Sequence, residues 1–177
     1  MIYTNRYTVT KVILIAHNLR SCHNVGSLLR TADGFGVEQV ILSGYTPYPH
    51  IPTNDPRMPH LAAKIDKQIH KTALGAEHTV QWQHTGNLLA TLRVLRQEGW
   101  HIAALEQSPD SISLSDFVPP DKLVLIAGRE VEGVESEVLQ ACDIILEIPM
   151  SGAKESFNVA SACAIALYHC RFSSHPS

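Results

Sequence analysis

The sequence predicts an α/β protein in which a parallel sheet is flanked by helices. Short apolar runs rich in β-branched residues recur along the chain, and helical patterns lie between them. Regular alternation of strands and helices is typical of βαβ units, whose strands are parallel. The runs are apolar at nearly every position, as expected of strands that helices cover on both faces.

Each element follows from a local pattern. Apolar, β-branched runs predict strands at 12–17, 39–44, 79–82, 101–106, 122–128 and 143–149. Helical spacing of apolar residues predicts helices at 24–35, 60–71, 86–98, 135–142 and 156–172. Longer irregular segments are expected at 45–59, 107–121 and 148–158. The first of them holds five of the ten prolines, and loops of this length are usually functional or mobile.

The helix at 24–35 presents an arginine to solvent. We expect Asn24 to cap this helix. Its apolar face then consists of Val25, Leu28, Leu29 and Ala32. Arg30 points nearly opposite, where an arginine is most often simply solvated. Gly26 in the first turn lowers helix propensity by about 1 kcal/mol, which indicates that another group lies close to it.

The helix at 60–71 is amphipathic. Its buried stripe is expected to consist of Leu61, Ile65 and Ile69. Its opposite stripe consists of Lys64, Lys67 and Lys71. The lysines are either a solvated face or a contact surface for phosphates, and the pattern alone leaves both open.

Ligands of parallel sheets bind at the carboxyl ends of the strands, and two further strand ends are rich in glycine and polar residues. Gly128 and Gly133 bracket Glu130, which indicates either a tight turn or a ligand lying against the backbone. The segment 148–170 begins its helix with Ser156 or Asn158 as the cap. Small side chains follow, which predict close packing against a neighbouring segment.

Several function classes lose their main support because their motifs are missing. No GxGxxG follows the first strand, and the chain has neither a GxxxxGK[ST] loop nor a GxSxG elbow. Dinucleotide-dependent dehydrogenases, P-loop NTPases and α/β-hydrolases are therefore disfavoured. The four cysteines form no CxxC and are expected to be small buried hydrophobes. The ten histidines show no zinc-site spacing, so we expect no metal.

We expect residues 1–177 to form a single domain with no separate RNA-binding domain. This length buries roughly 70% of the unfolded chain's surface, so the core needs no disulfide or metal. No apolar run reaches the ~18 residues of a membrane span. The first residues lack the pattern of a signal peptide. A cytoplasmic location is the expectation that follows.

The charge is unevenly distributed. The net charge is −3, which on its own argues against a nucleic-acid partner. Residues 1–71, however, carry eight basic and four acidic side chains, and the remainder carries a net charge of −7. Such asymmetry is a hint of a surface that faces a polyanion.

Three segments in this order resemble the sequence motifs of the SpoU (TrmH-like) branch of the SPOUT superfamily, the knotted RNA methyltransferases. They are NVGSLLRTADGFG (24–36), LIAGREVEG (125–133) and IPMSGAKESFNVASACAIAL (148–167). The resemblance extends over about residues 12–170. It implies a deep C-terminal trefoil knot, a homodimer, S-adenosylmethionine as the cofactor, and methylation of a ribose 2′-hydroxyl in tRNA or rRNA.

The resemblance also implies roles for individual residues. Those matching the catalytic positions are Arg30, Asn24, Glu130, Ser156 and Asn158. Those matching the cofactor site are Leu105, Gly128, Ile148, Met150, Ser156 and Phe157. RNA contacts are expected at Arg20, at Arg30 and, independently of the resemblance, at the stripe of Lys64, Lys67 and Lys71. Arg129 stands where many members carry Asn or another polar residue.

The implied chemistry suits an arginine. A sulfonium methyl is already electrophilic, so the enzyme mainly aligns it with the 2′-oxygen. Arg30 can stabilise the developing alkoxide or hold the adjacent phosphate, whereas a general-base role requires it to lose a proton above pKa ~12. Two alternatives stay open: methylation of a base by a protein of the same fold, and a non-catalytic RNA-binding module.

Overall fold

A single parallel sheet organises the chain. The computed structural model describes residues 10–129 and 132–172, and neighbouring strands in the sheet are hydrogen-bonded in the order β3-β2-β1-β6-β4-β7-β5. The strands are β1 (Lys11–His17), β2 (Gln39–Ser43), β3 (Trp82–Thr85), β4 (His101–Leu105), β5 (Ile112–Ser113), β6 (Lys122–Ala127) and β7 (Ile144–Glu147). Every pairing is parallel, which confirms the predicted fold class.

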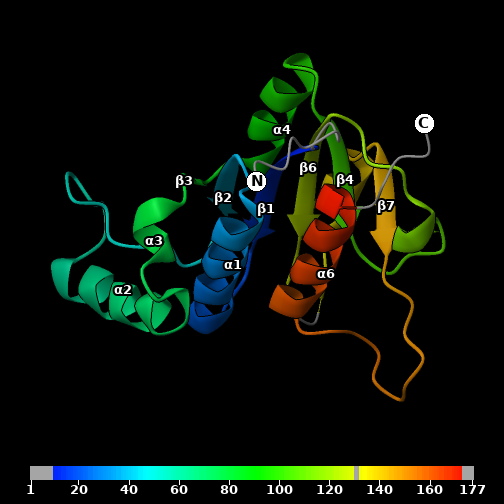
Figure 1. The fold of residues 1–177 in the computed structure, drawn as a ribbon. Helices are drawn as coiled ribbons and strands as arrows, with labels where there is room; N and C mark the ends of the chain where they lie inside the picture. The colour runs from blue at the N-terminus through cyan, green and yellow to red at the C-terminus, as the bar shows by residue number, and fades with distance from the viewer. Residues whose placement is uncertain (1–9, 130–131, 173–177) are drawn as a thin grey trace, which may run out of the picture.

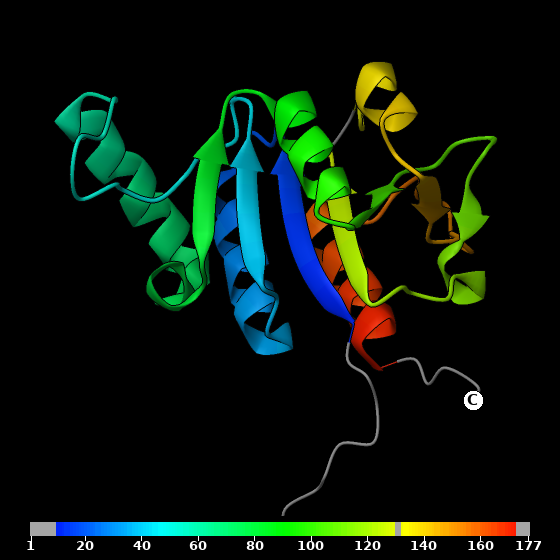
Figure 2. The ribbon, with the colours of Figure 1, turned by 90° about the horizontal axis from the view of Figure 1, so that it is seen from above.

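Helices cover both faces of the sheet (Figures 1 and 2). They are α1 (Cys22–Phe35), α2 (Pro59–Ala73), α3 (Ala76–Thr79), α4 (Leu88–Gln97), α5 (Ser136–Gln140), α6 (Val159–Phe172) and the 3-10 helix η1 (Leu114–Asp116). α1 and α6 lie side by side on one face, with α2 outside α1, and α4 and α5 cover the other face. None of the helices in the described ranges is long and apolar enough to span a bilayer.

The central strand β1 shows why the strand sequences are apolar throughout. Val12 and Leu14 belong to the core beneath α1 and α6. Ile13 and Ile15 belong to the core beneath α4 and α5. Successive side chains of a strand point to opposite faces, so a strand covered on both sides has no position left for a polar residue.

Helix α1 begins earlier than the sequence predicts. Ser21 is its N-cap, and the Ser21 hydroxyl accepts a hydrogen bond of 3.2 Å from the backbone N–H of Asn24. The prediction that Asn24 caps the helix is therefore wrong, because serine is an equally good cap and stands three residues earlier. The predicted apolar face is buried and Arg30 is exposed, as expected.

The prediction that something lies close to Gly26 is confirmed, and the neighbour is α2. A Cβ added at Gly26 would lie 2.2 Å from the Ile69 carbonyl oxygen and 2.2 Å from Thr72 Oγ1. The Thr72 hydroxyl donates a hydrogen bond of 2.8 Å to the carbonyl oxygen of His23. Only glycine lets the two helix backbones approach this closely.

The apolar stripe of α2 differs in part from the prediction. The buried residues are Ala62, Ile69 and Ala73, whereas Leu61 is 43% exposed. Ala62, Ile69 and Ala73 fall on one face at helical spacing, which includes the predicted Ile69, and the predicted Ile65 is partly buried against the same core. Small alanines occupy it because α2 packs so closely on α1. The three lysines of the opposite stripe are exposed, as predicted.

The strand predicted at 79–82 begins at its last residue instead. Residues 76–79 form α3, and Trp82 is the first residue of β3, paired with Val40. The Trp82 indole N–H donates a hydrogen bond of 3.1 Å to the carbonyl oxygen of Glu77. The short elements β5 and η1, inside the segment predicted as a loop, were also missed because two or three residues carry no periodicity.

The cysteines behave as small hydrophobes where they are fully enclosed. Cys163 and Cys170 are buried in the core under α6, and burial raises the pKa of each thiol to about 12. Cys22 and Cys142 are partly buried, and all four thiols are free. The predicted structural role is confirmed for Cys163 and Cys170.

The proline-rich segment 45–59 is held by one arginine. The Arg57 guanidinium stacks 3.7 Å from the centre of the Tyr48 ring and donates hydrogen bonds to the carbonyl oxygens of Tyr48 and Pro49. It also donates to both carboxylate oxygens of Asp55, and these hydrogen bonds hold the pKa of that carboxyl well below its usual range. Although it has no helix or strand before Pro59, this loop is tightly bonded.

Candidate functional site

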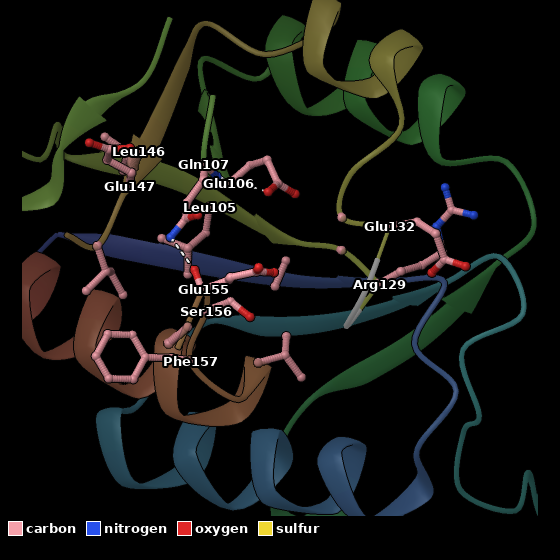
Figure 3. Close-up of a pocket in the computed structure, with 16 residues that line it drawn as sticks. Leu105, Glu106, Gln107, Arg129, Glu132, Leu146, Glu147, Glu155, Ser156 and Phe157 are labelled. Atoms are coloured by element: carbon pink, nitrogen blue, oxygen red, sulfur yellow. Dashed lines mark hydrogen bonds between the residues drawn. The ribbon is translucent and has the colours of Figure 1, made fainter. Parts of the chain in front are cut away.

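A pocket of about 260 Å³ opens at the carboxyl ends of β4, β6 and β7 (Figure 3). Its walls come from the residues that follow these strands and from the segment that precedes α6. The lining residues that the sequence predicted for a cofactor are Leu105, Gly128, Ile148, Ser156 and Phe157. Ligands of parallel sheets bind at this edge, so the position agrees with the fold.

A tight turn forms one end of the pocket. Arg129 and Gly133 exchange two backbone hydrogen bonds of 3.1 Å, and Gly133 has φ +69°. A Cβ added at Gly128 would lie 2.7 Å from the Gly133 carbonyl oxygen and 2.6 Å from a methyl group of Val134. The sequence left open whether this glycine pair serves a tight turn or a ligand that lies against the backbone. The turn itself requires glycine at position 128, and Gly128 also lines the pocket.

Glu106 holds this turn in place, and the sequence analysis missed it. One of its carboxylate oxygens accepts a hydrogen bond of 2.8 Å from the Val134 backbone N–H. The other accepts one of 2.9 Å from the Gln107 backbone N–H. The Gln107 side chain in turn donates a hydrogen bond of 2.9 Å to the Glu155 carbonyl oxygen (Figure 3). The only available signal was position: Glu106 ends the predicted strand run.

The first and third motif segments meet at a pair of asparagines. Asn158 Nδ2 donates a hydrogen bond of 3.1 Å to Asn24 Oδ1. Asn158 Oδ1 accepts one of 2.9 Å from the Ala160 N–H, so Asn158 caps α6 and Ser156 does not. This contact places the start of α1 beside the segment that carries Ser156 and Phe157.

Three motifs that are distant in the chain thus converge on one edge of the sheet. The sequence profile of the SpoU rRNA methylase family matches residues 57–168. The chain belongs to this family.

Curated relatives align with nearly the whole chain. A 23S rRNA (guanosine-2′-O-)-methyltransferase, RlmB, from Nitrosomonas europaea is 32% identical over 162 residues, which are 91% of this chain and 56% of that protein. RlmB from Ralstonia nicotianae is 31% identical over 89% of this chain and 57% of its own length. The chain therefore spans little more than half the length of these relatives.

Solved structures share the fold. A TrmH-family protein from Porphyromonas gingivalis has a TM-score of 0.74 at 28% identity, over 94% of this chain and 61% of its own. An rRNA methyltransferase from Sinorhizobium meliloti with bound AdoMet has a TM-score of 0.78 at 21% identity, over 95% and 58%. The SPOUT fold class is thereby confirmed, and the trefoil knot stays a prediction.

The other described residues that the sequence predicted for the site do not line the pocket. Arg30 is exposed, does not line the pocket, and has no hydrogen bond or ion pair to another described residue. Arg20 forms an ion pair of 3.2 Å with Glu132, which does line the pocket. Met150 is not among the lining residues, and Glu130 lies outside the described residues. Lys64, Lys67 and Lys71 lie on α2.

A polar cluster that no sequence pattern predicts lies beside the turn between Arg129 and Gly133. His17 Nδ1 lies 2.7 Å from Ser43 Oγ, and its Nε2 lies 3.0 Å from Glu135 Oε2. Asn18 Nδ2 donates a hydrogen bond of 2.7 Å to Glu135 Oε1, which is 3.5 Å from Arg129 Nη2. The cluster therefore connects the ends of β1 and β2 to the turn at the pocket.

Burial lowers the pKa of His17 below its ordinary value of 6.5, although Glu135 opposes the shift. The unfolded chain then binds a proton more readily than the folded one. We expect the free energy of unfolding to be constant above about pH 6.5 from this group and to fall as the pH drops below that value. Urea unfolding at a series of pH values measures it.

The variant His17→Asn isolates this contribution from those of the other histidines. Between neutral and mildly acidic pH, the free energy of unfolding should fall less in this variant than in the unmodified chain. An equal pH dependence in both proteins would show that His17 binds protons no differently in the folded and unfolded states.

Proposed function

We propose that this chain is an S-adenosylmethionine-dependent methyltransferase that modifies a ribose 2′-hydroxyl of RNA. The observation that carries the proposal is the convergence of the three motifs. Ser156 and Phe157 line the pocket, Asn158 bonds to Asn24, and α1 continues from Asn24 to the exposed Arg30. The family membership and the names of the relatives support the same reaction.

The pocket suits this cofactor chemically. Apolar side chains at one end, Leu146, Ile148 and Phe157, offer a surface for an adenine ring. Four glutamates line the pocket against one arginine among the described lining residues, which favours a ligand with positive groups such as a sulfonium and an ammonium. Arg129 lines the pocket, where its guanidinium is suited to pair with a ligand carboxylate.

S-adenosylmethionine supplies an electrophilic methyl group, and the protein has to orient the 2′-oxygen toward it. In this transfer an O–C bond forms, the S–C bond of the transferred methyl group breaks, and the hydroxyl proton passes to water. The planar Arg30 guanidinium stabilises negative charge on the oxygen or binds the neighbouring phosphate through two parallel hydrogen bonds. The hydrogen bond between Asn24 and Asn158 keeps α1 aligned with the pocket.

The proposal includes a homodimer, because Arg30 lies outside the pocket of its own chain. α6 exposes Ile165 at 40%, Tyr168 at 64% and Phe172 at 61%, an apolar surface that a second subunit can cover. Sedimentation equilibrium tests the subunit number.

The proposal also includes the trefoil knot that the SpoU resemblance implies and a cytoplasmic location.

For the substrate we propose rRNA first, since the relatives that are 31 to 32% identical act, by their names, on guanosine in 23S rRNA. Mass spectrometry of tRNA and rRNA from a deletion strain and its parent tests this. A single lost 2′-O-methyl nucleotide is the expected result. If a methyl group were lost from a base instead, the chain would be a base methyltransferase. If the lost methyl group belonged to a tRNA, tRNA would replace rRNA as the proposed substrate.

Calorimetry with S-adenosylmethionine tests the cofactor independently of the RNA. We expect saturable binding by the purified chain. Absence of binding would favour the RNA-binding module, because that function needs no cofactor.

The lysine stripe of α2 gives a further prediction. Replacing Lys64, Lys67 and Lys71 together with alanine should weaken RNA binding and flatten its salt dependence. Each phosphate contact that is lost lowers the slope of log K against log salt by about 0.9 for a duplex and about 0.7 for a single strand. Filter binding at several salt concentrations measures the slope. An unchanged slope would remove the stripe from the interface.

A further inference from the structure

A second group of chemically active side chains lies at the other end of the sheet. His70 belongs to α2, and Glu77 and His78 belong to α3, which leads into the edge strand β3. The pocket lies at the carboxyl ends of β4, β6 and β7, whereas α2 and α3 lie beside β3 at the opposite part of the sheet (Figure 1). Neither the proposed methyl transfer nor the lysine stripe uses these three residues.

A sharp reversal of the chain brings the three side chains together. α2 ends at Ala73, and the next two residues both have left-handed backbone conformations: Leu74 has φ +52° and Gly75 has φ +100°. The chain then turns into α3, so that Glu77 faces back toward the last turn of α2. The sequence spacing of the histidines matches no zinc motif because this reversal, rather than one helix, aligns them.

The Glu77 carboxylate is buried and held on one side. The residue is 5% exposed, and its Oε2 accepts a hydrogen bond of 3.0 Å from the Gly75 backbone N–H. This leaves Oε1 directed at the two imidazoles.

Both imidazoles direct a ring nitrogen at the same oxygen. His70 Nδ1 contacts Glu77 Oε1, and His78 Nε2 lies 3.6 Å from it. The three donor atoms all lie within 4.8 Å of one another. Donors around a tetrahedral zinc ion, at about 2.0 to 2.1 Å from the metal, are about 3.3 Å apart. The side chains of His70 and His78 are 58% and 74% exposed, so both can rotate to reach such positions.

We propose that His70, Glu77 and His78 bind a divalent transition-metal ion of the zinc class. Two imidazoles and one carboxylate are a donor set that zinc accepts, and water completes its coordination. The Gly75 N–H plays the orienting role that partners of metal-bound carboxylates usually play. The bound ion connects α2 to α3 and thus fixes the helix that carries the lysine stripe to the edge of the sheet.

Titration of the untagged full chain with Zn²⁺ near neutral pH, followed by calorimetry under reducing conditions, tests the proposal. We expect one ion per chain and a rise in the melting temperature that chelator reverses. His78→Ala should weaken the affinity at least tenfold, about the loss expected for removing a metal partner. His70→Ala should do the same, and His60→Ala, an exposed histidine of the same helix, should leave it unchanged.

The variants separate this site from other binding of the ion. Unchanged affinity in His78→Ala would overturn the proposal, because the ion would then be bound elsewhere, for example at cysteine thiols. Absence of saturable binding by the unmodified chain would overturn it as well. The His78 side chain is the most exposed of the three, and its ion pair with Glu77 is the only one of this imidazole among the described residues. Its variant therefore decides the matter even if His70→Ala fails to fold.

Discussion

Replacing Arg30 with alanine is expected to lower the rate of RNA methylation by about 100- to 1,000-fold, the loss typical of removing one group that stabilises a developing oxyanion. The affinity for S-adenosylmethionine should not change, because Arg30 does not line the pocket. Transfer of a labelled methyl group to RNA measures the first quantity, and calorimetry measures the second.

Two further variants make the result interpretable. Arg30→Lys keeps the charge but loses the planar guanidinium, so recovery of little activity would show that the geometry matters as well as the charge. Arg93→Ala, an exposed arginine of α4 on the opposite face of the sheet, should behave like the unmodified chain. If Arg30→Ala retained full turnover on its RNA substrate, Arg30 would not be a catalytic residue.

The second large effect concerns stability. Gly26→Ala should lower the free energy of unfolding by about 1 to 3 kcal/mol, the cost of inserting a methyl group where no space exists. The new Cβ would lie 2.2 Å from a carbonyl oxygen of α2, and backbone atoms cannot move aside as a flexible side chain can. Urea denaturation monitored by circular dichroism measures the change.

The same helix provides the matched control. A Cβ added at Gly34 meets nothing within 4 Å, and this residue is exposed. Gly34→Ala should therefore stabilise the chain by about 0.5 to 1 kcal/mol through the higher helix propensity of alanine. If both substitutions changed stability in the same direction, the close contact between α1 and α2 would not be what requires Gly26.

The sequence predicts the fold class well because the pattern is repeated. β1 and β6 are apolar on both faces, and only a sheet covered on both sides produces such runs. Short elements escaped prediction because they are too short to show a periodic pattern of apolar residues. α3, for example, is held by the hydrogen bond from Trp82 to Glu77, which no sequence pattern indicates. Asn24 was given a capping role that Ser21 holds, since both residue types cap equally well.

The site was predictable only in part. Gly128 could be proposed for a ligand site because parallel strands end at one edge, whereas Ile148 was predicted from the SpoU resemblance. The order in which strands lie beside one another is not contained in local patterns. For that reason the contact of Asn24 with Asn158, 134 residues away, and the assembly of His17 with Glu135 appear only in the folded chain.

The pocket is assembled from segments that are synthesised far apart in time. Leu105 is synthesised before Gly128, and Phe157 is synthesised after both. β1, α1 and β2 can pair while synthesis continues, but no cofactor can bind until the last segment docks, because Ser156 and Phe157 line the pocket. Closing such distant contacts is slow compared with local helix formation. A ligand of this pocket therefore binds only after all of the lining segments have docked, and it stabilises only the folded state of the chain.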